Sequence, residues 1–167
     1  MPTRHSILRS ALLAALWAAC AAVAVAQTAN IDFGGLRADP KLPIEVTADS
    51  FTVDQADHSA SFLGTVRVAQ GEMVLTAGEV RIEYAEDGKS IARLLARGGV
   101  LLKAGPDAAQ AQDAIYVLAS SEVTMTGDVV LTQGSAAISG QKLVVNLSNG
   151  TGRMEGGVTT IFTPGGN

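Results

Sequence analysis

The chain has 167 residues, and its 12 basic and 16 acidic side chains give a formal net charge of −4. This acidic balance argues against nucleic-acid binding, because a nucleic-acid-binding face needs basic side chains that displace counterions. The length suits a single domain, and the one cysteine, Cys20, excludes an intramolecular disulfide.

Residues 1–26 have the pattern of a secretory signal peptide. Arg4 and Arg9 precede an apolar run over residues 11–25, and Ala24-Val25-Ala26 places small residues at the two positions that signal peptidase reads. We expect cleavage that leaves Gln27 as the first residue of an exported protein. Removing Arg4 and Arg9 from the 12 basic residues leaves 10, against 16 acidic ones.

Two alternatives stay open for this segment. One is an uncleaved anchor, although the run is shorter and richer in alanine than a typical span of about 20 strongly apolar residues. The other is a lipoprotein modified at Cys20, although Trp17 is a bulky residue for the third position before such a cysteine.

An internal similarity recurs along the rest of the chain. Stretches that begin at Gly64, Gly98, Gly127 and Gly156 resemble one another, and their starts are 34, 29 and 29 residues apart. Similarity at a nearly fixed period indicates one supersecondary unit stacked on copies of itself, because a single unit cannot bury its apolar face alone.

Apolar and polar residues alternate within each unit, which is the pattern of strands with one buried face. No segment after residue 26 has helical periodicity. In chain order, strands are expected at residues 44–46, 51–53, 60–68, 80–84, 94–102, 114–118, 123–131, 143–147 and 157–162.

The apolar alternation slips by one residue at the same place in three units. The slips lie between Ala77 and Val80, between residues 111 and 114, and between residues 140 and 143. Such slips predict a bulge or corner that bends each strand. Turn residues at 57–58, 87–88, 120–121 and 149–150 predict the return paths. The expected fold is therefore all-β: stacked, bent antiparallel strands in an open-ended β-jellyroll with an apolar lining.

Each open end of such a stack has a strand edge that could pair with another chain. One edge is expected at Ile44, Glu45 and Val46, and the other at residues 158–162, which include Val158, Thr160 and Phe162 and carry no charge. Two interpretations of the second edge are equally open. It is free for association, or it is covered by residues 163–167 or by residues 31–41.

No catalytic, metal or cofactor site is expected. His58 is the single histidine after residue 26, and its place beside Asp57 is typical of a turn. A zinc site needs three or four ligands at a suitable spacing, and none is found. Neither a Gly-x-Ser-x-Gly elbow nor a phosphate loop occurs. Glu79 with Glu83 fits a solvated strand face better than a glycosidase pair.

The apolar lining has two interpretations, a packed core and a groove that holds lipid chains. Most apolar stripes are core, so the residues alone favour packing. The candidate lining residues are Val46, Phe51, Phe62, Val66, Val68, Leu102, Tyr116, Met125, Val129 and Leu131.

A family resemblance bears on this choice. In order along the chain, the motifs that carry it are Pro43-Ile44, Ala48-Asp49, Gly64-x-Val66-x-Val68-x-Gln70-Gly71, Ala77, Gly99-Val100, Ala114-x-Tyr116, Gly127-x-Val129-x-Leu131-x-Gln133-Gly134 and Gly140-x-x-Leu143. Their order and spacing resemble the LptA/OstA family of lipopolysaccharide-transport proteins. The resemblance implies a β-jellyroll domain over residues 43–162, after an extension over residues 27–42 and before a flexible tail over residues 163–167.

The resemblance also implies a function and partners. The protein would be a non-enzymatic periplasmic bridge that holds the acyl chains of lipid A in its interior. It would contact an LptC-like partner at the inner membrane, an LptD-like partner at the outer membrane, and further copies of itself head to tail. The Lys-rich tail of some family members is absent. Alternatives are an LptC-like subunit, a structural or adhesive β-solenoid with a dry core and, less favoured, a solenoid enzyme.

Overall fold

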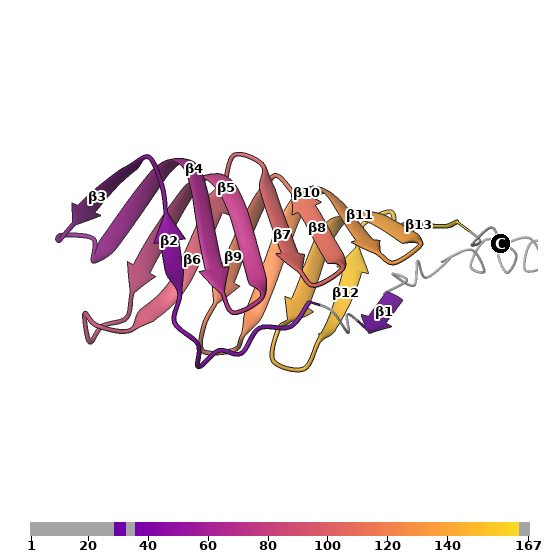
Figure 1. Cartoon of the computed structure of the whole chain (residues 1–167), viewed down its shortest axis with the longest axis horizontal. Coiled ribbons are helices and arrows are strands. Elements are labelled where there is room, and N and C mark those ends of the chain that lie inside the picture. The colour runs from indigo at the N-terminus through magenta and orange to yellow at the C-terminus, as the bar shows by residue number, and fades with distance from the viewer. Residues whose placement is uncertain (1–28, 33–35, 164–167) are drawn as a thin grey trace, which may run out of the picture.

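The computed structural model describes residues 29–32 and 36–163, which form strands and turns without a helix. Figure 1 shows the strands stacked along one long axis. The expected signal peptide and most of the expected tail lie outside the described residues. The strands are β1 (Ala29–Asp32), β2 (Glu45–Thr47), β3 (Ser50–Asp54), β4 (Ser59–Gln70), β5 (Met73–Tyr84), β6 (Ile91–Arg97), β7 (Val100–Ala104), β8 (Asp107–Ala111), β9 (Asp113–Val117), β10 (Glu122–Gln133), β11 (Ala136–Asn146), β12 (Thr151–Glu155) and β13 (Thr159–Phe162).

All strand pairs are antiparallel, and four long strands bend so that each contributes to two faces. The first face has the order β2-β4-β5-β7-β8-β10-β11-β13, and the second has the order β3-β4-β5-β6-β9-β10-β11-β12-β1. The halves of β4, β5, β10 and β11 lie in different faces. The expected all-β architecture of bent antiparallel strands is confirmed.

Glycine bulges produce the bend. The β4–β5 register shifts between Leu63 and Val66, and the β10–β11 register shifts between residues 126 and 129. Gly64 lies in the first shift at φ +102°, a conformation that glycine adopts easily. Ala77 and Val80 are both buried, so the one-residue slip expected between them is confirmed. That the units are copies of one repeat stays a prediction.

The two long sides of the molecule differ because of this topology. On one side, here called the bend side, the backbone runs from one face into the other. On the opposite side, here called the turn side, hairpin turns end each face separately. The four turns expected from sequence all lie there, at residues 55–58, 85–90, 118–121 and 147–150. His58 at φ 48° and Ser121 at φ 53° adopt the left-handed conformation that such turns need.

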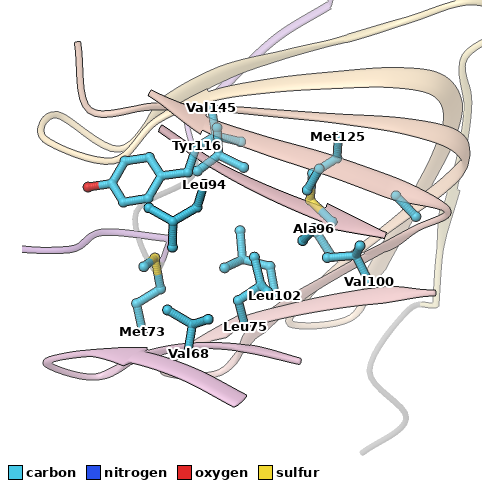
Figure 2. Packing of buried hydrophobic residues seen from close by; sticks show 14 of the residues in the cluster. Val68, Met73, Leu75, Leu94, Ala96, Val100, Leu102, Tyr116, Met125 and Val145 are labelled. Carbon is cyan, nitrogen blue, oxygen red and sulfur yellow. The ribbon is translucent and has the colours of Figure 1, made fainter. Parts of the chain in front are cut away.

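The interior lies between the two faces and is built from the inward residues of both. Val68, Met73 and Leu102 of the first face pack towards Leu94 and Tyr116 of the second (Figure 2). Many inward residues are small, among them Ala96, Ala109 and Ala114, so the two faces approach closely. Residues 29–32 and 36–163 contain no helix long and apolar enough to cross a membrane.

Candidate functional site

The candidate lining residues lie on the inner surface of the two faces. The first face contributes Val46, Val66, Val68, Leu102, Val129 and Leu131, and the second contributes Phe51, Phe62, Tyr116 and Met125. All but three are buried. Val46 and Phe62 are partly buried and pack against the core. The structure therefore places these residues along one continuous apolar surface. Whether they contact lipid stays a prediction.

The interior is closed. In the middle of the stack the two faces leave a cavity of about 10 Å³, lined by residues such as Val68, Leu94 and Tyr116. A cavity of this size is barely that of one water molecule. An acyl chain therefore needs the two faces to separate before it can lie between them.

One polar contact crosses this apolar interior. The Tyr116 hydroxyl of β9 donates to the Gln70 side-chain oxygen of β4 at 3.2 Å, and the Gln70 amide nitrogen donates to the Leu42 carbonyl at 3.1 Å. Gln70 is only 2% exposed. Burial raises the pKa of Tyr116, because desolvation disfavours the phenolate. The contact joins the second face, the first face and the chain that precedes β2.

That preceding chain, residues 36–42, runs along the turn side and is here called the strap. Figure 1 shows it along the lower edge of the molecule, between β1 and β2. Leu36 is 0% exposed and belongs to the buried core cluster with Leu147. The Ala38 N–H donates to the Leu147 carbonyl at 3.2 Å, and the Arg37 side chain donates to the Asn149 carbonyl at 3.1 Å. The first residues of the strap thus contact the β11–β12 turn of the second face.

At its other end the strap contacts the first face. Leu42 lies against Gly71 in the β4–β5 turn, so closely that a Cβ on this glycine would come within 2.8 Å of the leucine side chain. Between the two ends, a hollow of about 460 Å³ lies beside Pro40 and Glu72. The strap therefore spans from one face to the other and is fastened mainly at its two ends.

The strap is held weakly compared with a strand. Burial of a leucine side chain contributes about 1.5–3 kcal/mol, and each hydrogen bond adds about 0.5–1.5 kcal/mol. Each methylene group of an acyl chain that leaves water contributes about 0.8 kcal/mol. Burial of one long acyl chain can therefore offset the loss of the strap contacts.

The two ends of the stack expose apolar residues. At one end, Phe51 of β3 is 58% exposed although it lies on the inner surface opposite Phe62, with ring centroids 4.8 Å apart. At the other end, Phe162 of β13 is 72% exposed and pairs with Ala136. The inner surface is therefore uncovered at both ends, which a fully packed core does not require.

The segments expected to form edges lie at the two ends of the stack, and their role in association stays a prediction. Among the described strands β13 pairs only with β11, and Val158 lies just before it. β1 instead pairs with β12, so this segment covers an edge of the second face and not β13. Residues 164–167, the other expected cover, lie outside the described residues. At the other end β2 and β3 each pair with β4 and with no other strand of the described part of the chain, and Ile44 directly precedes β2.

Charged side chains gather on the outer surface of the second face. Arg81 of β5 pairs with Asp57 at 3.2 Å and with Glu83 at 3.8 Å, and Arg93 of β6 also pairs with Glu83. These groups neutralise one another away from the interior. Within residues 29–32 and 36–163 no group of three or more His, Cys, Asp or Glu side chains is placed to hold a metal.

Sequence reasoning missed the strap and the buried Tyr116–Gln70 contact. Leu36 has the apolar neighbours Phe33 and Ala38 at the unequal spacings of three and two residues, so no regular strand or helix period marks it as core. The sequence contains a weak indication of a polar contact at Gln70, because Gln70 and Gln133 occupy the same place in two of the similar stretches. Gln133 also makes a polar contact, donating to the buried Asp107 at 3.2 Å.

Known proteins provide an independent comparison. Residues 45–151 match the sequence model of the LptA/(LptD N-terminal domain) LPS transport protein family. An uncharacterized protein of Rhizobium meliloti (strain 1021) is 27% identical over 143 residues, which cover 81% of this chain and 77% of that protein.

A solved structure also matches. It is LptH, described as the LptA-homologous periplasmic component of the lipopolysaccharide transport device of Pseudomonas aeruginosa. The TM-score is 0.68 at 19% identity, and the match covers 76% of this chain and 99% of that one. At this identity the likeness supports the fold. The family match covers well over half of the sequence, so the chain belongs to the LptA/LptD amino-terminal-domain family of lipopolysaccharide transport proteins.

Proposed function

We propose that this protein is a non-enzymatic periplasmic bridge that carries lipopolysaccharide from the inner to the outer membrane. The observation that carries the proposal is the apolar inner surface that runs between two uncovered ends, marked by Phe51 and Phe162, in a member of a lipopolysaccharide transport family. Lipid A acyl chains would lie between the faces, and the sugars would stay in water.

Loading requires the faces to separate, and the topology favours separation on the turn side. On the bend side β4, β5, β10 and β11 carry the backbone through both faces, so separation there would break continuous strands. On the turn side the faces end in separate hairpins. Glycine bulges such as that at Gly64 can act as hinges, because hinge positions must absorb changes in φ and ψ.

The ends of the stack fit partners that add strands. β2 and β3 at one end and β13 at the other have free edges among the described strands, and such edges can pair with another chain through main-chain hydrogen bonds. Head-to-tail joining of two copies would bring Phe162 of one towards Phe51 of the next. An LptC-like protein and an LptD-like protein would use the same kind of joint at the two ends of the bridge.

Two alternatives have a specific basis. The small internal cavity favours a structural or adhesive β-solenoid with a dry core. An LptC-like subunit of the same pathway would have the same fold, and fold alone does not assign function. The uncovered apolar ends favour the bridge over the dry solenoid.

Photo-cross-linking to lipopolysaccharide tests the proposal. Benzoylphenylalanine placed at Phe62 or Tyr116 should label the lipid, since both positions line the inner surface and already hold aromatic rings. The matched control is Arg67, which lies on the outer surface of the same β4 strand. Equal labelling at the inner and outer positions, or no labelling at any of them, would exclude a lipid path between the faces.

A further inference from the structure

We infer that the strap, residues 36–42, is a lid on the turn side that must leave its place before acyl chains can enter between the faces. The inference rests on the proposed function, because it concerns how the same interior is loaded. It adds a segment that lies outside the matched family region, which begins at residue 45.

The strap lies where loading would occur. It crosses the side on which the two faces end in separate hairpins, and it contacts a hairpin of each face, at Leu147 and at Gly71. Leu36 contributes its side chain to the same buried cluster as the lining residue Met125. A lipid chain that enters from this side would therefore take the place of Leu36.

The strap can also detach as a unit. It forms no strand ladder with either face. The Lys41 and Leu42 N–H groups both donate within the strap, to the Asp39 side chain at 3.0 Å and to its carbonyl at 3.1 Å. These bonds need no contact with the body, so the turn around Pro40 can persist when the strap moves. The hollow beside Pro40 shows that the middle of the strap is not tightly packed.

Release of the strap is coupled to separation of the faces through Gln70. This side chain donates to the Leu42 carbonyl in the strap and accepts from Tyr116 of the second face. When Leu42 leaves, the Gln70 amide loses its partner in an apolar setting, which favours its turning to water. That movement breaks the Tyr116 contact, so the lid and the cross-face bond open together.

A reversible cross-link between the strap and the body tests the inference. Ala38→Cys with Ser148→Cys is suited to this, because the Ala38 N–H bonds to Leu147 and places residues 38 and 148 beside one another. The variant carries Cys20→Ala, so that no other thiol is present. Binding of radiolabelled short-sugar lipopolysaccharide is measured on oxidised and reduced protein.

If the strap is a lid, the oxidised protein binds this lipid about tenfold more weakly or worse, because the binding-competent state is depleted, and reduction restores the affinity. The matched control is Thr132→Cys with Ala137→Cys, which joins residues that already lie opposite one another on β10 and β11. This disulfide should leave binding unchanged. Amide hydrogen exchange in residues 36–42 should also increase when the lipid is added.

A second variant loosens the lid without a cross-link. Leu36→Asn places an amide among apolar groups, which weakens the strap and should raise lipid affinity several-fold with an unchanged circular dichroism spectrum. Equal binding by oxidised and reduced protein, with no effect of Leu36→Asn, would overturn the lid and leave the proposed function standing. Absence of lipid binding in every variant and in the unmodified protein would overturn the proposed function and the lid with it.

Discussion

Tyr116 of β9 and Gln70 of β4 form a hydrogen bond of 3.2 Å across the interior, from the second face to the first. Both residues are buried, and the Gln70 amide nitrogen also donates to the Leu42 carbonyl of the strap. Removing only one of the two hydrogen-bonding groups costs stability, because the remaining polar group stays buried in an apolar interior without a partner. The pair therefore stabilises the closed arrangement of the two faces.

Tyr116→Phe should lower the free energy of unfolding by about 1–3 kcal/mol, since it leaves the Gln70 oxygen buried without its donor. Urea unfolding followed by circular dichroism measures the change. Tyr84→Phe, at the end of β5, is the matched control and should have a smaller effect. Adding Gln70→Leu to Tyr116→Phe should recover part of the loss. A loss in the free energy of unfolding that is larger in the double variant than the two single losses added together would contradict a favourable interaction between Tyr116 and Gln70.

Alkaline pH should destabilise the protein through Tyr116. Burial raises the pKa of this group above its ordinary value of 10.0, because desolvation disfavours the phenolate. The folded state therefore holds the phenolic proton more tightly than the unfolded state, and its contribution to stability is complete below about pH 10. The contribution is lost as the pH rises through the folded-state pKa.

The measurement is the urea midpoint as a function of pH, with tyrosinate absorbance recorded in parallel. The decline that begins near pH 10 should be smaller in Tyr116→Phe than in the unmodified protein. An identical decline in the two proteins would mean that another group controls alkaline unfolding.

Gly64→Ala should destabilise the bend between the faces. Gly64 has φ +102°, and a Cβ there would come within 2.1 Å of the Asp49 carboxylate. The Thr65 N–H donates to this same carboxylate at 3.1 Å, so the contact cannot relax freely. We expect a loss of at least about 2 kcal/mol in the free energy of unfolding.

Gly88→Ala is the control for this substitution. Gly88 also has a positive φ, +64°, but nothing lies within 4 Å of an added Cβ. Its cost should therefore be limited to about 1 kcal/mol of backbone strain. Equal losses for Gly64→Ala and Gly88→Ala would show that steric contact at the bulge contributes little.

The sequence predicted the features that depend on local patterns. Alternation located strands such as those expected at residues 60–68 and 123–131, the slip between Ala77 and Val80 located the bend, and Asp87-Gly88 located a turn. The single strand expected at residues 94–102 was wrong, because the chain there forms β6 and β7 in different faces, and β8 and β12 were not predicted. In that turn the Ser90 hydroxyl and the Lys89 and Ser90 N–H groups donate to the Asp87 carboxylate and lower its pKa. Each of these features needs only residues that are near in the chain.

Features that depend on distant segments were not predictable in the same way. The pairing of β1 with β12, across more than a hundred residues, has no local signature. The same holds for Leu36, whose burial depends on the β11–β12 turn. The closed interior follows from how near the two faces approach, which small residues such as Ala96 and Ala114 permit but do not determine.

Export should leave a protein that begins at Gln27 in the periplasmic fraction. The expectation depends on the Ala24-Val25-Ala26 site, which lies outside the described residues. Intact-mass measurement of the protein from that fraction tests it. A protein that retains Met1, or one that carries lipid on Cys20, would contradict cleavage at this site.

Proline substitutions at two neighbouring positions of β13 should have different effects. A proline at Thr160 should impair association, and a proline at Ile161 should also impair folding. The Thr163 N–H donates to the Ser135 carbonyl of the neighbouring turn at 3.0 Å. The direction of the backbone N–H groups alternates along an antiparallel strand. The Ile161 N–H therefore points towards β11, as that of Thr163 does, and the Thr160 N–H points away from β11. Thr160→Pro therefore removes a donor from the free edge, whereas Ile161→Pro removes one that faces β11.

If copies join head to tail through this edge, light scattering of the unmodified protein should show a mass that rises with concentration. Such a heterologous joint need not close, so it extends into a rod. Thr160→Pro should abolish the rise and leave the circular dichroism spectrum and urea midpoint nearly unchanged. Ile161→Pro should lower the midpoint as well, which separates loss of the joint from loss of β13. A monomeric unmodified protein at high concentration, or unimpaired assembly of Thr160→Pro, would place the joint on another surface.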